Sequence, residues 1–108
     1  MSATTTNAYD PLRGTPLMQC VPETIPTGGE DVFTADFYIT EITFTNTTAS
    51  PIAVTVSDKQ GTPLALFSAL SVPANSILAY RFDGRWMPGG VHWSAASAGV
   101  VGYLRGYY

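Results

Sequence analysis

Residues 38–58 constrain the fold most, because their side chains alternate in character along two consecutive runs. In the first run the two sides of the chain carry different sets, Thr40, Ile42, Phe44 and Asn46 against Ile39, Glu41, Thr43 and Thr45. After the polar break at residues 47–51 the second run alternates again, with Ile52, Val54 and Val56 against Ala53, Thr55 and Ser57. A period of two with one apolar face is typical of half-buried strands, so we expect an antiparallel pair here.

The rest of the chain continues as short strand-like segments between turn residues. Turns are predicted where Gly, Pro, Asn and Asp gather, at residues 58–61, 72–75 and 83–84, with a loop at residues 86–90. Gly61 is expected to supply the positive φ of the first turn. Six or seven short strands without a long window of helical period predict an all-β fold. We expect a compact antiparallel β-sandwich, jelly-roll-like in its architecture.

An extended, proline-rich amino-terminal arm is predicted at residues 1–31, before a β-sandwich domain at residues 32–108. Four prolines and the Gly28-Gly29 pair exclude helix interiors and central strands from the arm. The arm also carries apolar side chains that a free linker would not need, Tyr9, Leu12, Leu17, Met18, Val21 and Ile25. They would lie against their own domain or against a neighbouring subunit, and the sequence leaves both placements open.

Composition restricts the partners of this chain, whose 108 residues accommodate a single core. Charged residues make up 12% of it, against about 25% in an average domain, which favours a protein that covers part of its surface with another molecule. The five basic residues do not cluster and the net charge is −3, so we expect no nucleic-acid partner. No apolar run approaches the ~20 residues of a bilayer span, and no membrane partner is expected. The first residues lack the pattern of a secretory leader, which predicts cytoplasmic synthesis.

Reactive groups are few and isolated, which predicts a protein that is not an enzyme and needs no cofactor or metal. Cys20 is the only cysteine, so no internal disulfide can form, and we expect it to act as a small buried hydrophobe. His92 is the only histidine and lacks a partner for a catalytic dyad or zinc site, so we expect it on the outer side of its strand. The acidic residues are scattered and form no calcium loop. Asn46-Thr47-Thr48 matches a glycosylation sequon, which has meaning only in a secreted protein.

Aromatic residues crowd the last third of the chain, where they would fill a core or a contact with another molecule. Trp93 alternates with Val91 and is expected in the core, whereas Trp86, in a loop, is expected outside. Two rings at the end of the chain predict a carboxyl-terminal segment held against this subunit or the next. With the arm residues, the candidate interface residues are Tyr9, Leu12, Leu17, Met18, Val21, Ile25, Trp86, Met87, Tyr103, Tyr107 and Tyr108.

Residues 42–107 contain the segments TNTTASPIAVTVSD, LSVPANSI and PGGVHWSAASAGVVGYLRGY. A Val-Pro-Ala-Asn-Ser turn leads into a strand, and a glycine-led segment with Ser-Ala repeats runs into the last strand. In these features the chain resembles small β-sandwich virion proteins of tailed bacteriophages, of the decoration, fibre or baseplate type. The resemblance implies a non-enzymatic, oligomeric β-sandwich that is made in the host cytoplasm and located in the virion.

Two functions follow from the resemblance and stay open. In the first, the protein is a capsid decoration or cement protein or a head–tail component. Its partners would be copies of itself, a trimer by analogy, and other virion proteins such as the major capsid protein. In the second, it is a carbohydrate- or receptor-binding module of a phage tail, in which Trp86, Tyr103 and Tyr107 form a stacking platform.

Overall fold

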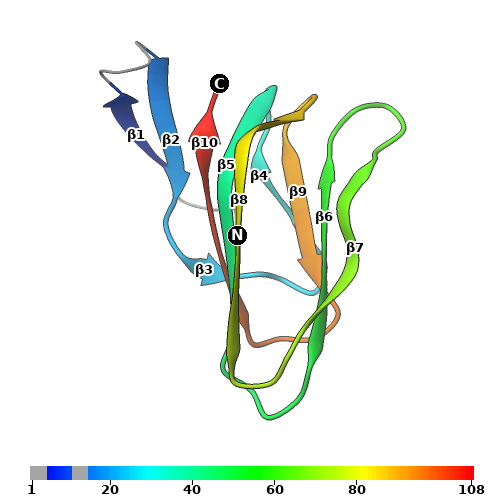
Figure 1. Ribbon diagram of the computed structural model, residues 1–108. Helices are drawn as coiled ribbons and strands as arrows, with labels where there is room; N and C mark the ends of the chain where they lie inside the picture. The colour runs from blue at the N-terminus through cyan, green and yellow to red at the C-terminus, as the bar shows by residue number, and fades with distance from the viewer. Residues whose placement is uncertain (1–4, 11–14) are drawn as a thin grey trace.

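The computed structural model describes residues 5–10 and 15–108, with side chains from residue 18 onward. The described residues form ten strands, β1 (Thr5–Asp10), β2 (Thr15–Cys20), β3 (Glu23–Thr24), β4 (Glu30–Phe33), β5 (Phe37–Asn46), β6 (Ile52–Asp58), β7 (Ala65–Val72), β8 (Ser76–Met87), β9 (Val91–Ala95) and β10 (Val100–Tyr107). Sheet A has the order β1-β2-β10-β5-β8, with β3 also paired to β10, and sheet B has the order β4-β9-β6-β7 (Figure 1). All pairs are antiparallel, and the predicted all-β sandwich is confirmed.

The core lies between the two sheets and is built from the alternate positions of their strands. In β6, β9 and β10, buried residues alternate with partly exposed ones along the whole strand. Trp93 is fully buried, as predicted, and its indole nitrogen donates a hydrogen bond to Glu30 Oε1 at 3.2 Å. The hydrophobic faces of both sheets are therefore buried against each other, and the opposite faces point away from the core.

The prediction that the two alternating runs pair with each other is wrong. β5 pairs with β10 and β8 in sheet A, whereas β6 pairs with β9 and β7 in sheet B. The apolar residues of the two runs are fully buried from opposite sheets, Ile42 and Phe44 from β5 and Val54 and Val56 from β6. A period of two shows which face of a strand is apolar, and such faces can be buried across a sandwich as well as side by side.

Buried Asn46 fixes the crossover from β5 to β6 with four hydrogen bonds. Its side-chain nitrogen donates to the carbonyl oxygens of Ser50 at 2.8 Å and Val72 at 3.0 Å. Its oxygen accepts from the backbone nitrogen of Thr48 at 2.9 Å and from the Thr48 hydroxyl at 2.7 Å. The sequon at this position therefore has its asparagine nitrogen buried and fully engaged in the folded protein, so it cannot carry a glycan there.

An irregularity between β5 and β8 changes the alternation that the sequence predicts. The register shifts between Ile39 and Glu41, so Ile39 is buried although it was expected on the same side as Glu41. In the facing part of β8, Gly84 has a φ of 88°, a conformation that glycine adopts without steric cost. β8 therefore passes through Gly84 and ends at Met87, and the turn predicted at residues 83–84 is wrong.

The amino-terminal segment is extended, and its described part belongs to the sandwich itself. β2 and β3 pair with β10, and β4 pairs with β9. The side chains of Met18, Cys20 and Ile25 are buried in the common core. Of the two placements that the sequence left open, the described residues of this segment adopt the one against their own domain.

Cys20 is buried, as predicted, and we expect its thiol to react slowly in the native protein. Burial, with Glu23 and Glu30 nearby, raises the pKa of the Cys20 thiol to about 12. The thiol therefore stays protonated at neutral pH, and the thiolate is the reactive form. Labelling by Ellman's reagent should be at least about 100-fold slower than for free cysteine, and should become fast in denaturant. Rapid labelling without denaturant would show that β2 leaves the sheet easily.

Candidate functional site

One side of the sandwich is bounded by the two end strands β7 and β8, which follow each other in the chain but belong to different sheets (Figure 1). No described strand pairs with the outer edge of either one. Most of their core-facing apolar side chains are only partly buried, and we call this set the open side: Leu66, Phe67, Leu70, Leu78, Tyr80 and Phe82. The strands of the sandwich interior bury such residues completely, so the open side is where this domain covers its core least.

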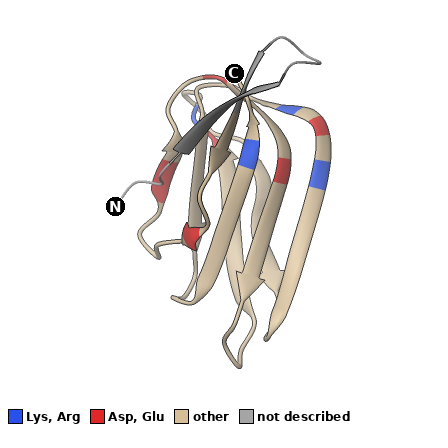
Figure 2. Cartoon of the chain, turned by 90° about the vertical axis from the view of Figure 1, so that its left-hand side faces the viewer, with Lys and Arg blue, Asp and Glu red and all other residues tan. Residues whose placement is uncertain are grey.

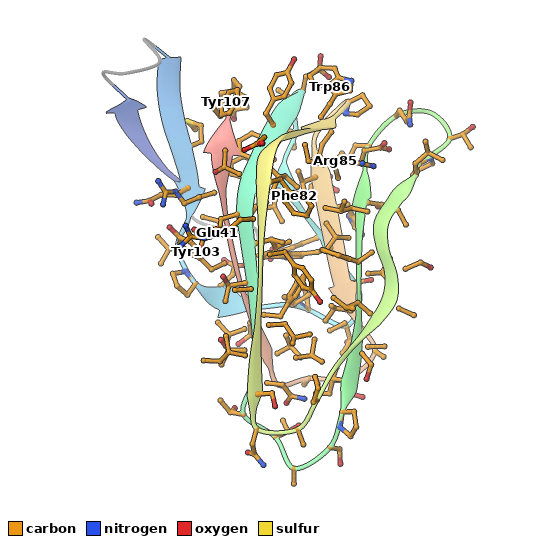
Figure 3. The ribbon with its side chains drawn as sticks, viewed as in Figure 1. Glu41, Phe82, Arg85, Trp86, Tyr103 and Tyr107 are labelled. Atoms are coloured by element: carbon orange, nitrogen blue, oxygen red, sulfur yellow. The ribbon has the colours of Figure 1, made fainter. Side chains whose placement is uncertain are left out.

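Phe67 holds the open side together. Its ring centroid lies 4.8 Å from that of Tyr80 and 6.5 Å from that of Phe82, both on β8. It also meets Phe44 of the core edge to face at 6.0 Å. Figure 3 shows Phe82 directed from β8 into the space between the sheets. The two sheets are thus joined at this side by aromatic contacts and by few backbone contacts, which leaves apolar surface beside them.

A hollow of about 570 Å³ continues the open side toward the end of β8, and its wall combines polar and apolar residues, Asp58, Gln60, Leu64, Gly84, Arg85, Trp86 and Pro88. Asp58 is buried and accepts hydrogen bonds from Leu64 N at 3.1 Å, Gln60 N at 3.3 Å and Gln60 Nε2 at 3.0 Å. These bonds order the loop, and Gly61 does not adopt the positive φ predicted for it. The Asp58 carboxylate is therefore part of the loop structure.

Three aromatic rings form a row on the outer face of sheet A, one on each of its strands β10, β5 and β8. Tyr107 is paired with Tyr38, and Tyr38 is paired with Trp86. The centroids of Tyr38 and Tyr107 are 5.1 Å apart with planes inclined by 15°, and those of Tyr38 and Trp86 are 4.8 Å apart and inclined by 41°. The three rings therefore cover much of one another's faces. Trp86, 45% exposed, is the most accessible of the large residues in this row.

Charged residues occupy the same outer face beside the aromatic row. Arg105 is paired with Glu41, and Glu41 with Arg81, so positive and negative side chains alternate across three strands. The Arg105 Nη1 and Glu41 Oε1 atoms are 3.8 Å apart. Figure 2 shows the coloured positions of these strands in the upper half of the sheet, with the lower half almost free of charge. This face carries both signs, so it offers no single-sign field for a strongly charged ligand.

The predicted interface residues fall into three groups. Trp86, Tyr103 and Tyr107 lie on the outer face of sheet A, where the Tyr103 hydroxyl donates to Gln19 Oε1 at 2.9 Å. Val21 is exposed, and Tyr108 is half exposed while its ring meets those of Phe33 and Phe37 edge to face. The third group has side chains in the core of this subunit, Met18, Ile25 and Met87, so these three cannot serve as surface contacts in this arrangement.

The side chains of Tyr9 and Leu17 and the whole of Leu12 lie outside the described residues. Sequence reasoning missed Tyr38 and the open side. A signal for Tyr38 existed in the alternation of β5, which places it beside Tyr107 once the strands are paired. The open side has a weaker signal, because β7 contains apolar residues without the regular alternation of β6.

Asp31 contacts two side chains, those of Lys59 and His92, on the outer face of sheet B. Its Oδ2 lies 2.8 Å from Lys59 Nζ, and its Oδ1 lies 2.8 Å from His92 Nδ1. The hydrogen bond from Lys59, followed by that from His92, lowers the pKa of the Asp31 carboxyl below its ordinary value. His92 is on the outer side of its strand, as predicted, and its position beside Asp31 gives it a structural partner.

The lowered pKa of Asp31 predicts a weak pH dependence of stability. A carboxyl with a depressed native pKa stabilises the fold above its unfolded pKa of about 3.9 and loses this contribution as the pH falls through the native value. We therefore expect Asp31→Asn to lower the free energy of unfolding at pH 7 by less than about 1 kcal/mol, since the pair is exposed to solvent. Urea unfolding of both proteins from pH 7 to pH 2 measures this loss. A difference in the free energy of unfolding between wild type and Asp31→Asn that widens on acidification would contradict a stabilising role of the Asp31 carboxylate.

Within the described part of the chain, no three His, Cys, Asp or Glu side chains gather as metal ligands. The same residues contain no helix of the length and hydropathy that a membrane span requires. Comparison of the chain with protein-family models and with curated proteins finds no match.

Proposed function

We propose that the protein is a non-enzymatic structural subunit of a bacteriophage particle and that it works as an oligomer. The observation that carries the proposal is the open side, where two end strands leave six core-facing apolar side chains only partly buried. Covering apolar surface contributes roughly 25 cal/mol per Å², so association at this side stabilises the subunit and the assembly together. The low share of charged residues, 12%, supports the same conclusion.

Three acidic groups, Asp58, Asp31 and Glu30, support a structural role because each of them has a partner that fixes it within the fold. Asp58 orders the loop after β6, Asp31 binds Lys59 and His92, and Glu30 accepts the indole hydrogen bond of Trp93. A general acid or base needs a group that is directed at a substrate, and these carboxylates are directed at the protein itself. Capsid decoration, cement and head–tail contacts need only matching surfaces.

The test is whether the protein co-purifies with phage particles. Particles are purified on a density gradient from a culture that carries the gene, and an antibody against the protein locates it among the fractions. We expect the protein in the particle band, and Leu66→Glu on the open side to reduce its amount there at least about tenfold. Thr34→Glu, at an exposed position after β4, is the matched control and should leave the amount unchanged. Recovery of the wild-type protein only at the top of the gradient would refute the proposal.

A carbohydrate- or receptor-binding module of a phage tail is the second candidate, and the aromatic row favours it. Exposed rings stack on sugar faces, and Trp86 presents a partly free ring beside the charged residues of the same face. The mutual stacking of Tyr38 and Tyr107 leaves fewer ring faces for a ligand. Glycan-array binding that disappears in Trp86→Ala without a change in oligomeric state would establish this function in place of the first.

A further inference from the structure

We propose that the hollow between the loop after β6 and the end of β8 binds an acidic sugar, such as a uronic acid unit of a glycan, and that Arg85 binds the carboxylate of that sugar. The hollow is a different site from the aromatic row on the outer face of sheet A. A ligand here is an activity beyond the structural role in a particle, and neither proposal depends on the other.

The two walls of the hollow are joined by backbone contacts. The Lys59 nitrogen donates a hydrogen bond to the Pro88 carbonyl oxygen at 3.1 Å, which ties the loop to the segment after β8. Gly89 in that segment has a φ of 80°, and a Cβ atom there would lie 2.6 Å from the Lys59 carbonyl oxygen. Asp58 orders the rest of the loop by accepting three hydrogen bonds. Because the walls are already fixed, little entropy is lost when a ligand binds between them.

The size and the apolar surface of the hollow suit a single sugar ring. Its volume of about 570 Å³ lies within the range of roughly 300–1,000 Å³ that is typical of small-molecule sites. Leu64 and Trp86 border it with side chains that are 64% and 45% exposed. The C–H faces of a sugar pack on such apolar side chains, and best on an indole ring. Consecutive residues of a strand point to opposite faces, and Arg85 and Trp86 both border the hollow because it opens at the free edge of β8.

Arg85 gives the hollow an available cation. It is paired with buried Ile39, and Figure 3 shows its side chain directed from β8 toward β6. Among the described residues, no Asp or Glu oxygen lies within 4.0 Å of its guanidinium nitrogens. A guanidinium group binds a carboxylate through two parallel hydrogen bonds, and such charged pairs are stronger than hydrogen bonds between neutral groups. A ligand that carries a carboxylate therefore supplies the partner that the described fold does not give to Arg85.

Gln60 and Asp58 favour a ligand with hydroxyl groups and a single negative charge. Gln60 Nε2 donates to Asp58 Oδ2 at 3.0 Å, so the amide oxygen of Gln60 is left to accept a hydrogen bond from a ligand hydroxyl. Asp58 adds a fixed negative charge to the wall opposite Arg85. This charge repels a ligand with several negative charges, such as a phosphate, more than it repels one carboxylate. A sugar acid meets both conditions.

The test is a titration of ¹⁵N-labelled protein followed by NMR, with glucuronate and glucose as a matched pair of ligands. The two sugars share one ring and differ at C6, where glucuronate has a carboxylate and glucose a hydroxymethyl group. Glucuronate should shift the amide signals of residues 58–64 and 84–89 in a saturable way, and glucose should bind at least about tenfold more weakly, because only glucuronate pairs with Arg85. Arg85→Gln should abolish this preference by weakening the binding of glucuronate alone.

Arg81→Gln is the matched control, since Arg81 is an exposed arginine of the same strand that is paired with Glu41 and does not border the hollow. It should leave the binding of both sugars unchanged. Gln60→Ala should weaken glucuronate several-fold, and signals unchanged away from the hollow show that each variant is folded. Equal binding of glucose and glucuronate, equal binding of acetate and glucuronate, or shifts confined to the aromatic row would each overturn the proposal. Arg85→Gln should not change the amount of protein in the particle band, so the two proposals fail separately.

Discussion

Replacing Gly106 by alanine is expected to destabilise the protein by more than about 3 kcal/mol, the cost of forcing a side chain into a packed core. Gly106 is buried in β10, where β5 approaches so closely that a Cβ atom would overlap the carbonyl oxygen of Tyr38. The same Cβ would lie 2.8 Å from the ring of Phe37. Because a backbone atom is the obstacle, the two central strands of sheet A would have to separate locally. Urea unfolding followed by tryptophan fluorescence measures the loss.

Gly61→Ala is the matched control for this substitution. A Cβ at Gly61 has no neighbour within 4 Å, and the residue does not adopt a positive φ. Alanine there should change stability by less than about 1 kcal/mol, or raise it slightly by restricting the unfolded chain. Equal effects of the two substitutions would show that β10 and β5 are not packed as closely as described.

Asn46→Ala is expected to cost about 2–4 kcal/mol, because it removes all four side-chain hydrogen bonds at the crossover between the sheets. The carbonyl oxygen of Val72 would lose its Asn46 donor in a buried setting, and Thr48 would lose its acceptor. Since the crossover joins β5 of one sheet to β6 of the other, the loss acts on both sheets. Thermal and urea unfolding together measure it.

Two further variants separate the roles of the Asn46 amide. Thr47→Ala, at the exposed neighbouring position, should change stability by less than about 0.5 kcal/mol. Asn46→Asp keeps the acceptor for Thr48 but loses the donor to Ser50 and Val72, so it should be destabilising as well, and more so at pH 7 than under acidic conditions, where the buried carboxyl is protonated. If Asn46→Ala leaves the free energy of unfolding unchanged, the hydrogen bonds of Asn46 do not stabilise the crossover.

The sequence predicts the faces of the strands well and their partners poorly. In β10 the alternation separates Val100 and Leu104, which are buried, from Tyr103 and Tyr107, which are partly exposed, because side-chain direction along a strand is a local property. The pairing of β5 with β8 and β10 depends on contacts between residues far apart in the chain. Local pattern does not contain that information, so adjacent runs were paired with each other.

The candidate surfaces were predictable only where a residue's exposure follows from its own strand. Trp86 is exposed, as expected, but it belongs to β8 and not to the loop in which the sequence placed it. The open side exists because both sheets end at the same place, which is a property of the whole topology. The same reason explains Ile25, for which the sequence left open a place against its own domain or against a neighbouring subunit. Its strand neighbours lie on β10, about 75 residues later, and their contacts bury it.

The position of β10 has a consequence for synthesis on the ribosome. β10 lies between β2 and β3 on one side and β5 on the other, although all three precede it by many residues. Until β10 leaves the exit tunnel, each of these strands lacks its central neighbour. A nascent chain halted before Val100 would therefore expose the unpaired edges of β2, β3 and β5. Sheet A is therefore completed only after β10 has been synthesised, and its unpaired edges need protection from aggregation until then.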